Sequence, residues 1–170
     1  MIGYLILLLA VAAERVLELI VSRRNLRWSI ERGGTEVGAG HYPAMVTLHT
    51  GLLIGCAAEV LLADRPFLPA LGWPCLGLVL ASQALRWWCI GTLGRQWNTR
   101  IVVVAGLGLV RTGPYRLLRH PNYVAVVVEG AALPLVHTAW LTAAIFTVVN
   151  AVLLRTRIRA ENAALATVPT

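Results

Sequence analysis

Charged residues are scarce in this chain, and lysine is absent. Only 14% of the 170 residues are charged, and all 15 basic residues are arginines. A soluble domain of this length carries far more charge, so the composition excludes an ordinary soluble fold. The hydrophobic residues make up 58% of the chain and fall in long runs rather than in alternating patterns. Such runs are typical of an all-α integral membrane protein.

The motifs of several common site classes are also missing. The three cysteines, Cys56, Cys75 and Cys89, are far apart and lie in apolar runs, which indicates neither a metal site nor a disulfide framework. The segment "AGLG" lacks the third glycine of a dinucleotide-binding GxGxxG motif, and no βαβ pattern surrounds it. A P-loop and a Ser-His-Asp pattern are absent as well. We therefore expect no bound metal and no Rossmann domain.

Five apolar runs predict five transmembrane helices in one bundle, at about 2–22, 43–63, 67–93, 121–136 and 138–156. We expect these helices to form a single domain over residues 1–170. The fourth run is short, because about 16 residues span about 24 Å, less than the hydrocarbon core of about 30 Å. Only "VHT" around His137 separates the fourth and fifth runs. This spacing predicts a tight antiparallel helical hairpin.

The net charge of +7 comes from arginines that flank the apolar runs. Only Arg65 lies on one side of the predicted bundle. Twelve arginines lie on the other side, after the first, third and fifth runs: Arg23, Arg24, Arg27, Arg32, Arg95, Arg100, Arg111, Arg116, Arg119, Arg155, Arg157 and Arg159. The positive-inside rule then places the N-terminus outside and the C-terminus in the cytoplasm, for a multi-pass protein of the inner membrane. Because this rule accounts for the arginines, we expect no nucleic-acid partner.

Before the fourth helix, "RIVVVAGLGLVRTGPY" predicts a short strand-turn-strand at the cytoplasmic surface.

Polar residues interrupt the apolar runs. Glu14, Glu18 and Asn25 recur at spacings that place them on one helical face. The later runs contain other polar side chains, namely His49, Glu59, Gln83, Arg86 and Glu129. An ionisable group in a membrane helix costs about 2.5–3.5 kcal/mol, so we expect these groups to face inward and to be paired. They either hold the helices together or form part of a site, and the pattern alone leaves both interpretations open.

Two further polar clusters lie near the ends of the last two predicted helices. Arg119, His120, Asn122 and Tyr123 precede Glu129 by less than two helical turns. Pro121 suits the first turn of a helix, where free N–H groups favour an anion. On the last helix Asn150, Arg157 and Glu161 share a face, and Arg157 and Glu161 have the spacing of an i,i+4 pair. The predicted hairpin would bring His120 and Tyr123 next to Arg157 and Glu161.

The segments "GPYRLLRHPNY" and "RTRIRAENAAL", with Glu129 between them, resemble the isoprenylcysteine carboxyl methyltransferase family. The segments "ERVLELIVSRRN", "RGGTEVGAGHYPAMVTLH" and "LGRQWNTRI" resemble its small bacterial branch. This resemblance implies a membrane-embedded O-methyltransferase that uses S-adenosylmethionine and releases S-adenosylhomocysteine. It places the cofactor-binding part at about residues 94–165.

The resemblance also implies roles for individual residues. It assigns to the cofactor Gln96, Tyr115, Arg119, His120, Pro121, Tyr123, Glu129 and Glu161. It makes Arg157, Glu161 and His120 the catalytic residues. Arg157 would orient a carboxylate acceptor, whereas a phenol or enol acceptor needs a base, for which His120 and Glu161 are the candidates. Asn162 stands where the family often has a second acid, a departure that bears on any role requiring two carboxylates.

The implied substrate is a membrane lipid or another lipophilic small molecule. It is either a carboxylate of the isoprenylcysteine type or, as in the bacterial branch, a long-chain alkylpyrone or alkylresorcinol. Five residues are candidates to face its head group, and the same residues can instead hold the bundle together: Glu18, Asn25, His41, His49 and Asn98. Two alternatives remain open at this point. Sterol reductases that use NADPH share the RHPxY ending, and the internal charges alone fit a non-catalytic membrane scaffold.

Overall fold

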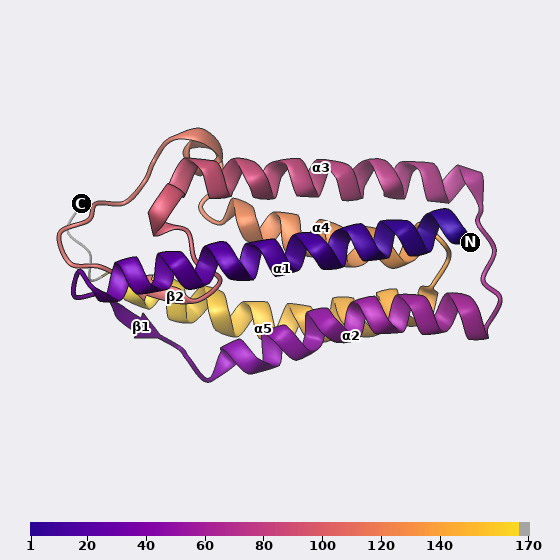
Figure 1. Ribbon diagram of the computed structural model, residues 1–170, viewed down its shortest axis with the longest axis horizontal. Coiled ribbons are helices and arrows are strands. Elements are labelled where there is room, and N and C mark those ends of the chain that lie inside the picture. The colour runs from indigo at the N-terminus through magenta and orange to yellow at the C-terminus, as the bar shows by residue number, and fades with distance from the viewer. Residues whose placement is uncertain (167–170) are drawn as a thin grey trace.

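Five long helices run along the length of the molecule (Figure 1). The computed structural model describes residues 1–166. The helices are α1 (Ile2–Ile30), α2 (His41–Leu62), α3 (Pro69–Leu93), α4 (Pro121–Leu135) and α5 (Trp140–Leu165). The predicted number of helices is confirmed. We call the end at which α1, α3 and α5 finish and α2 and α4 begin the arginine-rich end.

Helix α1 continues eight residues beyond the predicted apolar run. Ser22, Asn25 and Ser29 are buried at helical spacing along this extension, so a polar face replaces the apolar one. The helix terminates where Gly33 adopts a φ of 76° and the Gly34 N–H donates to the Ser29 carbonyl at 2.9 Å. Helix α5 likewise continues past the predicted end at 156 to Leu165. Polar residues of both extensions therefore reach beyond the apolar part of the bundle.

The predicted strand-turn-strand before α4 is wrong. Strand β2 (Ile101–Val103) pairs antiparallel with β1 (Thr35–Val37), which lies in the connection between α1 and α2. Arg100 joins the two segments, since its Nη1 lies 2.8 Å from Glu36 Oε1 and its guanidinium lies over the Tyr42 ring at 4.1 Å. After β2 the chain forms no second strand. It passes through an irregular segment into the 3₁₀ helix η2 (Gly113–Arg116).

Helices α4 and α5 form the tight hairpin that the spacing predicts. The connection is Val136–Ala139, in which Thr138 has a φ of 54°. Glu59 of α2 accepts hydrogen bonds from the backbone N–H groups of Thr142 at 2.8 Å and Leu141 at 3.1 Å. Arg65 pairs with the same carboxylate at 2.9 Å. Glu59 therefore stabilises the start of α5, and its contacts are those of a structural residue.

The apolar core fills the half of the bundle away from the arginine-rich end. It contains Tyr4, Leu8, Val11, Leu52, Cys56, Val60, Cys75, Val79, Ala132, Leu133, Val136, Ala139 and Phe146. Gly130 allows α4 and α5 to approach closely, because a Cβ at this position would overlap the Phe146 ring. The side chain of Tyr4 is also satisfied here, since its hydroxyl donates to the Leu133 carbonyl at 3.0 Å.

Within residues 1–166, three helical segments are long and apolar enough to cross a membrane: His41–Leu62, Pro69–Gln96 and Trp140–Leu165. The outer surface is correspondingly apolar, with Leu62 87% and Val152 67% exposed. Helix α1 contains three charged residues, Glu14, Arg15 and Glu18, in its middle, and α4 has only 15 residues. These two helices lie beside the other three along the bundle (Figure 1).

Candidate functional site

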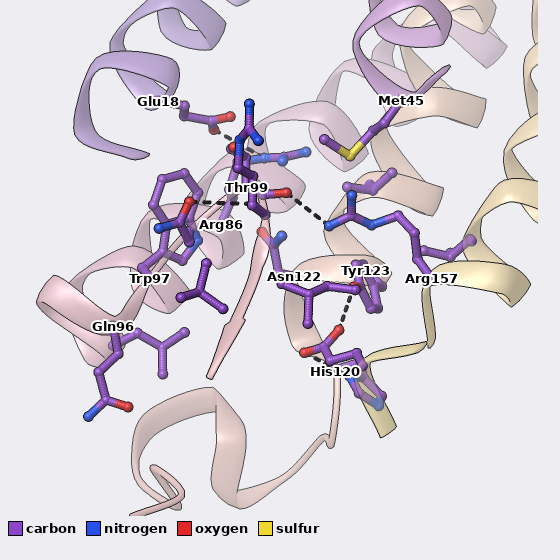
Figure 2. A pocket seen from close by; sticks show the side chains of 18 of the residues that line it. Glu18, Met45, Arg86, Gln96, Trp97, Thr99, His120, Asn122, Tyr123 and Arg157 are labelled. Atoms are coloured by element: carbon purple, nitrogen blue, oxygen red, sulfur yellow. Dashed lines mark hydrogen bonds and ion pairs between the residues drawn. The ribbon is translucent and has the colours of Figure 1, made fainter. Parts of the chain in front are cut away.

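A cavity of about 1110 Å³ occupies the arginine-rich end of the bundle. Its walls come from α1, α2, α4 and α5, from the end of α3, and from the segment that connects α3 to α4. Figure 2 shows Glu18, Arg86 and Thr99 on one side of this space and His120 and Tyr123 on the other, with Arg157 reaching across toward Thr99. Polar side chains from distant parts of the sequence thus face a common volume.

His120, Tyr123 and Glu161 form a hydrogen-bonded cluster where α4 begins and α5 ends. The Tyr123 hydroxyl donates to Glu161 Oε2, and His120 Nε2 donates to Asn162 Oδ1 at 3.0 Å. His120 Nδ1 lies 3.7 Å from Glu161 Oε1, and the His120 and Tyr123 rings stack with centroids 5.4 Å apart. Hydrogen bonding with Glu161 raises the pKa of His120 above its ordinary value of 6.5. The helical hairpin therefore brings the two predicted clusters together.

Arg157 is buried, with 7% of its surface exposed. Its Nη2 donates to the Thr99 carbonyl at 2.9 Å, while its Nε has no hydrogen-bond partner within residues 1–166. Ser22 of α1 holds the Thr99 segment, because its Oγ donates to Asn98 Oδ1 at 2.7 Å and accepts from the Thr99 N–H at 3.1 Å. The predicted pairing of Arg157 with Glu161 is not formed among the described residues, since Glu161 bonds to His120 and Tyr123 instead.

Four charged groups from three helices form a buried ion cluster beside the cavity. Glu129 accepts hydrogen bonds from Arg15 Nη2 at 2.6 Å and from Arg86 Nη2 at 2.5 Å. Glu18 Oε2 lies 2.5 Å from Arg15 Nη1, and Glu18 Oε1 lies 3.4 Å from Arg86 Nε. Two guanidinium groups thus balance two carboxylates. The predicted inward pairing of these residues is confirmed.

The cavity becomes apolar between α1 and α2. Ala12, Val16 and Leu19 of α1 line it there, opposite Leu53 and Ile54 of α2. Val16 is 56% exposed and Ile54 is 64% exposed. This part of the cavity is therefore lined by accessible apolar side chains of two helices. One end therefore suits a polar ligand, and the other suits an apolar chain.

Sequence comparison identifies the family of this chain and a relative. A model of the isoprenylcysteine carboxyl methyltransferase (ICMT) family matches residues 75–167, which is more than half of the chain. The chain belongs to the ICMT family. Over 161 residues it is also 39% identical to YpbQ, an uncharacterized protein of Bacillus subtilis (strain 168), with 94% of this chain and 95% of that protein covered.

Membership of the ICMT family and the three apolar helices make this chain a multi-pass membrane methyltransferase. The family match favours this function over the sterol-type reductase and the scaffold. Among residues 1–166, no group of three or more His, Cys, Asp or Glu side chains is placed to hold a metal ion.

The cavity brings together most of the residues that the sequence singled out. Those that line it are Glu18, His49, Gln96, Asn98, Tyr115, Arg119, His120, Tyr123, Arg157 and Glu161. Tyr115 of η2 lies next to Cys89, and the burial of its hydroxyl raises the pKa of Tyr115 above its ordinary value. These placements are compatible with the roles expected from the ICMT resemblance, and the roles themselves stay predictions.

Four predicted site residues lie outside the cavity lining. Glu129 faces Arg15 and Arg86, and Pro121 is buried in the first turn of α4. Asn25 donates to the Gly94 and Trp97 carbonyls at 3.1 Å and 2.7 Å, so it links α1 to the end of α3. His41 begins α2 and lies next to Gly38. Glu129 and Asn25 contact other protein groups, as expected if these two residues hold the helices together rather than bind a ligand.

Three residues of the site were given no predicted role, although Asn122 belongs to the polar cluster predicted before Glu129. Ser22 lies on the buried face of α1 four residues after Glu18, so its spacing was a usable signal. Asn122 lies inside the RHPNY segment and lines the cavity with a buried Oδ1 that has no partner in the described part of the chain. Thr99 accepts a hydrogen bond from Arg157 through its backbone carbonyl. Every residue has such a carbonyl, so the amino-acid type at this position could not predict the contact.

Proposed function

We propose that this protein is an S-adenosylmethionine-dependent O-methyltransferase that takes its acceptor from the membrane. One observation carries the proposal: a single cavity joins the polar cluster at the start of α4 and the end of α5 to an apolar part lined by α1 and α2. Pockets that bury one drug-sized ligand measure about 300–1,000 Å³. A cavity of about 1110 Å³ has room for a nucleoside-containing methyl donor together with part of a lipophilic acceptor.

The polar part of the cavity fits S-adenosylmethionine chemically. Asn98 Nδ2 and Arg157 Nε are buried donors without partners in the described chain, and Asn122 Oδ1 is a buried acceptor without one. Buried polar atoms normally have hydrogen-bond partners, so a polar ligand here would supply what these atoms lack. The donor's carboxylate, ammonium, ribose and adenine groups offer both acceptors and donors. Cofactor-binding roles are proposed for Gln96, Tyr115, Arg119, His120, Tyr123 and Glu161.

The bound donor would supply a methyl group on a sulfonium, which needs no further activation by the protein. The protein's contribution is then mainly to position the acceptor oxygen. Arg157 is fixed for such a task, because it is buried and tied to the Thr99 carbonyl at 2.9 Å. The apolar side chains of Val104, Leu107 and Leu109 line the cavity near the arginine-rich end and would exclude water from the reacting groups.

We propose that the arginine-rich end faces the cytoplasm. The arginines in the C-terminal parts of α1 and α5 and in the connections after α1 and α3 support this orientation through the positive-inside rule. A water-soluble methyl donor would then enter from the cytoplasm, and the acceptor would enter from the bilayer between α1 and α2. The acceptor is either an isoprenylcysteine-type carboxylate or an alkylpyrone or alkylresorcinol, because each combines a long apolar chain with a reactive oxygen.

Binding of S-adenosylhomocysteine to the purified protein in lipid nanodiscs tests the proposed site. We expect Glu161→Gln and His120→Ala each to weaken binding by about tenfold or more, because each removes a charged or hydrogen-bonding group from the polar cluster. Arg155→Gln is the matched control, since Arg155 lies on α5 but is exposed and outside the cavity lining. Calorimetric affinities that are unchanged in both site variants would contradict the assignment.

A further inference from the structure

His49 projects from α2 into the cavity with one ring nitrogen already engaged. Its Nδ1 lies 2.9 Å from the Met45 carbonyl oxygen, one turn earlier on the same helix. A carbonyl oxygen can only accept, so Nδ1 carries the hydrogen, and the neutral ring then has its lone pair on Nε2. Among residues 1–166 no hydrogen bond to Nε2 is formed. The free nitrogen of His49 is therefore available to a ligand in the cavity.

The surroundings of His49 hold the ring in place between the polar and apolar parts of the cavity. The Phe146 ring packs against it edge-on, with centroids 5.5 Å apart and an interplanar angle of 88°. Three charged groups of the ion cluster, Arg86, Arg15 and Glu129, act on the ring electrostatically. Because that cluster balances two guanidinium groups with two carboxylates, it presents both signs of charge to the ring. Apolar residues of the same helix, such as Leu53, line the cavity one turn further along.

The two candidate bases of the polar cluster, His120 and Glu161, are already committed. His120 Nε2 bonds to Asn162, and its Nδ1 faces Glu161. Glu161 accepts the hydrogen bond of Tyr123 as well. His49 Nε2 is thus the imidazole nitrogen lining the cavity that has no partner in the described chain.

We propose that His49 Nε2 takes the proton of a hydroxyl acceptor, so that the substrate is a lipophilic phenol or enol rather than a carboxylic acid. This inference rests on the proposed methyl transfer. The acceptor's O–H bond breaks and its proton moves to Nε2. The oxygen electron pair forms the new O–CH₃ bond, the methyl–sulfur bond breaks, and its electron pair stays on the sulfur of S-adenosylhomocysteine. A carboxylate is already ionised at neutral pH and would give His49 no proton to accept.

Acceptor binding without any methyl donor gives the first test. The probes are a phenol that carries a long alkyl chain and its methyl ether, both titrated into the protein in nanodiscs. One hydrogen bond to Nε2 makes the phenol bind about three- to tenfold more tightly than the ether. His49→Leu removes this preference. His49→Gln retains much of it, because its amide oxygen still accepts a hydrogen bond. An equal preference in the wild type and in the folded His49→Leu variant overturns the proposal.

Methyl transfer gives the second test, with the alkyl phenol and the matching long-chain benzoic acid as acceptors. His49→Gln lowers methylation of the phenol by about 10²–10⁴-fold, because the amide cannot take the proton. S-adenosylhomocysteine affinity stays unchanged in this variant, which separates the effect from loss of the cofactor site. A wild-type protein that methylates only the acid, or an unchanged rate on the phenol in His49→Gln, overturns the proposal. If the wild type neither binds S-adenosylhomocysteine nor transfers a methyl group, the proposed function fails, whereas the binding preference still decides the role of His49.

Discussion

His120 shows at the scale of one residue how the fold combines stability with a binding site. It is the residue directly before α4, and its ring contacts Glu161 and Asn162 near the end of α5. Its hydrogen bond with Glu161 is strongest when the imidazole is protonated, which is why the pKa of His120 lies above 6.5. The same pair that fixes the two helix ends therefore also sets the charge of the polar cluster.

The raised pKa of His120 predicts a pH-dependent contribution to stability. The unfolded chain has the ordinary pKa of 6.5, so the contribution of the pair is fully present below that pH and is lost as the pH rises through the higher folded value. Because the pair is partly exposed, we expect a difference in Tm of about 1–3 °C between the wild type and His120→Ala at low pH. Thermal unfolding from about pH 5.5 to about pH 9 measures it. A difference that does not shrink as the pH rises would argue against this pairing.

Single residues also show what can be inferred from sequence. The charges within apolar runs predicted inward pairing of Glu18, Arg86 and Glu129, because an isolated charge in a membrane helix is too costly. The identity of the partners could not be predicted, since it depends on how α1, α3 and α4 are rotated against one another. Glu129 consequently meets two arginines rather than lining the cavity.

At the scale of elements, the ion cluster joins α1, α3 and α4 at the level where the packed core gives way to the cavity. Removing one member leaves the opposite charge buried and unbalanced. The cluster is therefore expected to hold three helices in register where apolar packing between them ends.

The cluster predicts a charge-balance effect on stability. Glu129→Gln leaves Arg15 and Arg86 with a single carboxylate, and we expect a loss of about 3–5 kcal/mol in the free energy of unfolding. The double variant Glu129→Gln with Arg86→Gln removes one charge of each sign and should recover part of that loss. Unfolding by denaturant in detergent micelles measures both variants. A double variant that loses the sum of the two single effects would show that the charges act independently.

The helices were predictable and the small sheet was not. Apolar run lengths and a three-residue connection predict α2 to α5, because local hydropathy and spacing determine them. The pairing of β1 with β2 places Thr35 opposite Val103, although the two residues are far apart in the chain. The sequence pattern of a hairpin predicts pairing only between neighbouring strands, so it could not predict this contact. The extension of α1 to Ile30 was missed because its buried face carries Ser22, Asn25 and Ser29 rather than apolar residues.

At the scale of the whole molecule, the bundle is divided into a packed half and a hollow half. Core side chains near the N-terminus hold the helices together, and the cavity takes the place of a core at the arginine-rich end. In the hollow half, apolar side chains of α1 and α2, among them Val16 and Ile54, line the cavity. This division allows a polar and an apolar ligand to meet inside a chain of 170 residues.

Methyl transfer in oriented membranes tests the central proposal most directly. S-adenosylmethionine with a labelled methyl group is added to sealed inner-membrane vesicles that contain the protein, either everted or right-side-out, together with a long-chain alkyl phenol. We expect label to enter the lipid extract of everted vesicles, S-adenosylhomocysteine to inhibit this transfer, and right-side-out vesicles to show little of it. Transfer only in right-side-out vesicles would contradict the orientation, and no labelled lipid in either kind would contradict the proposed function.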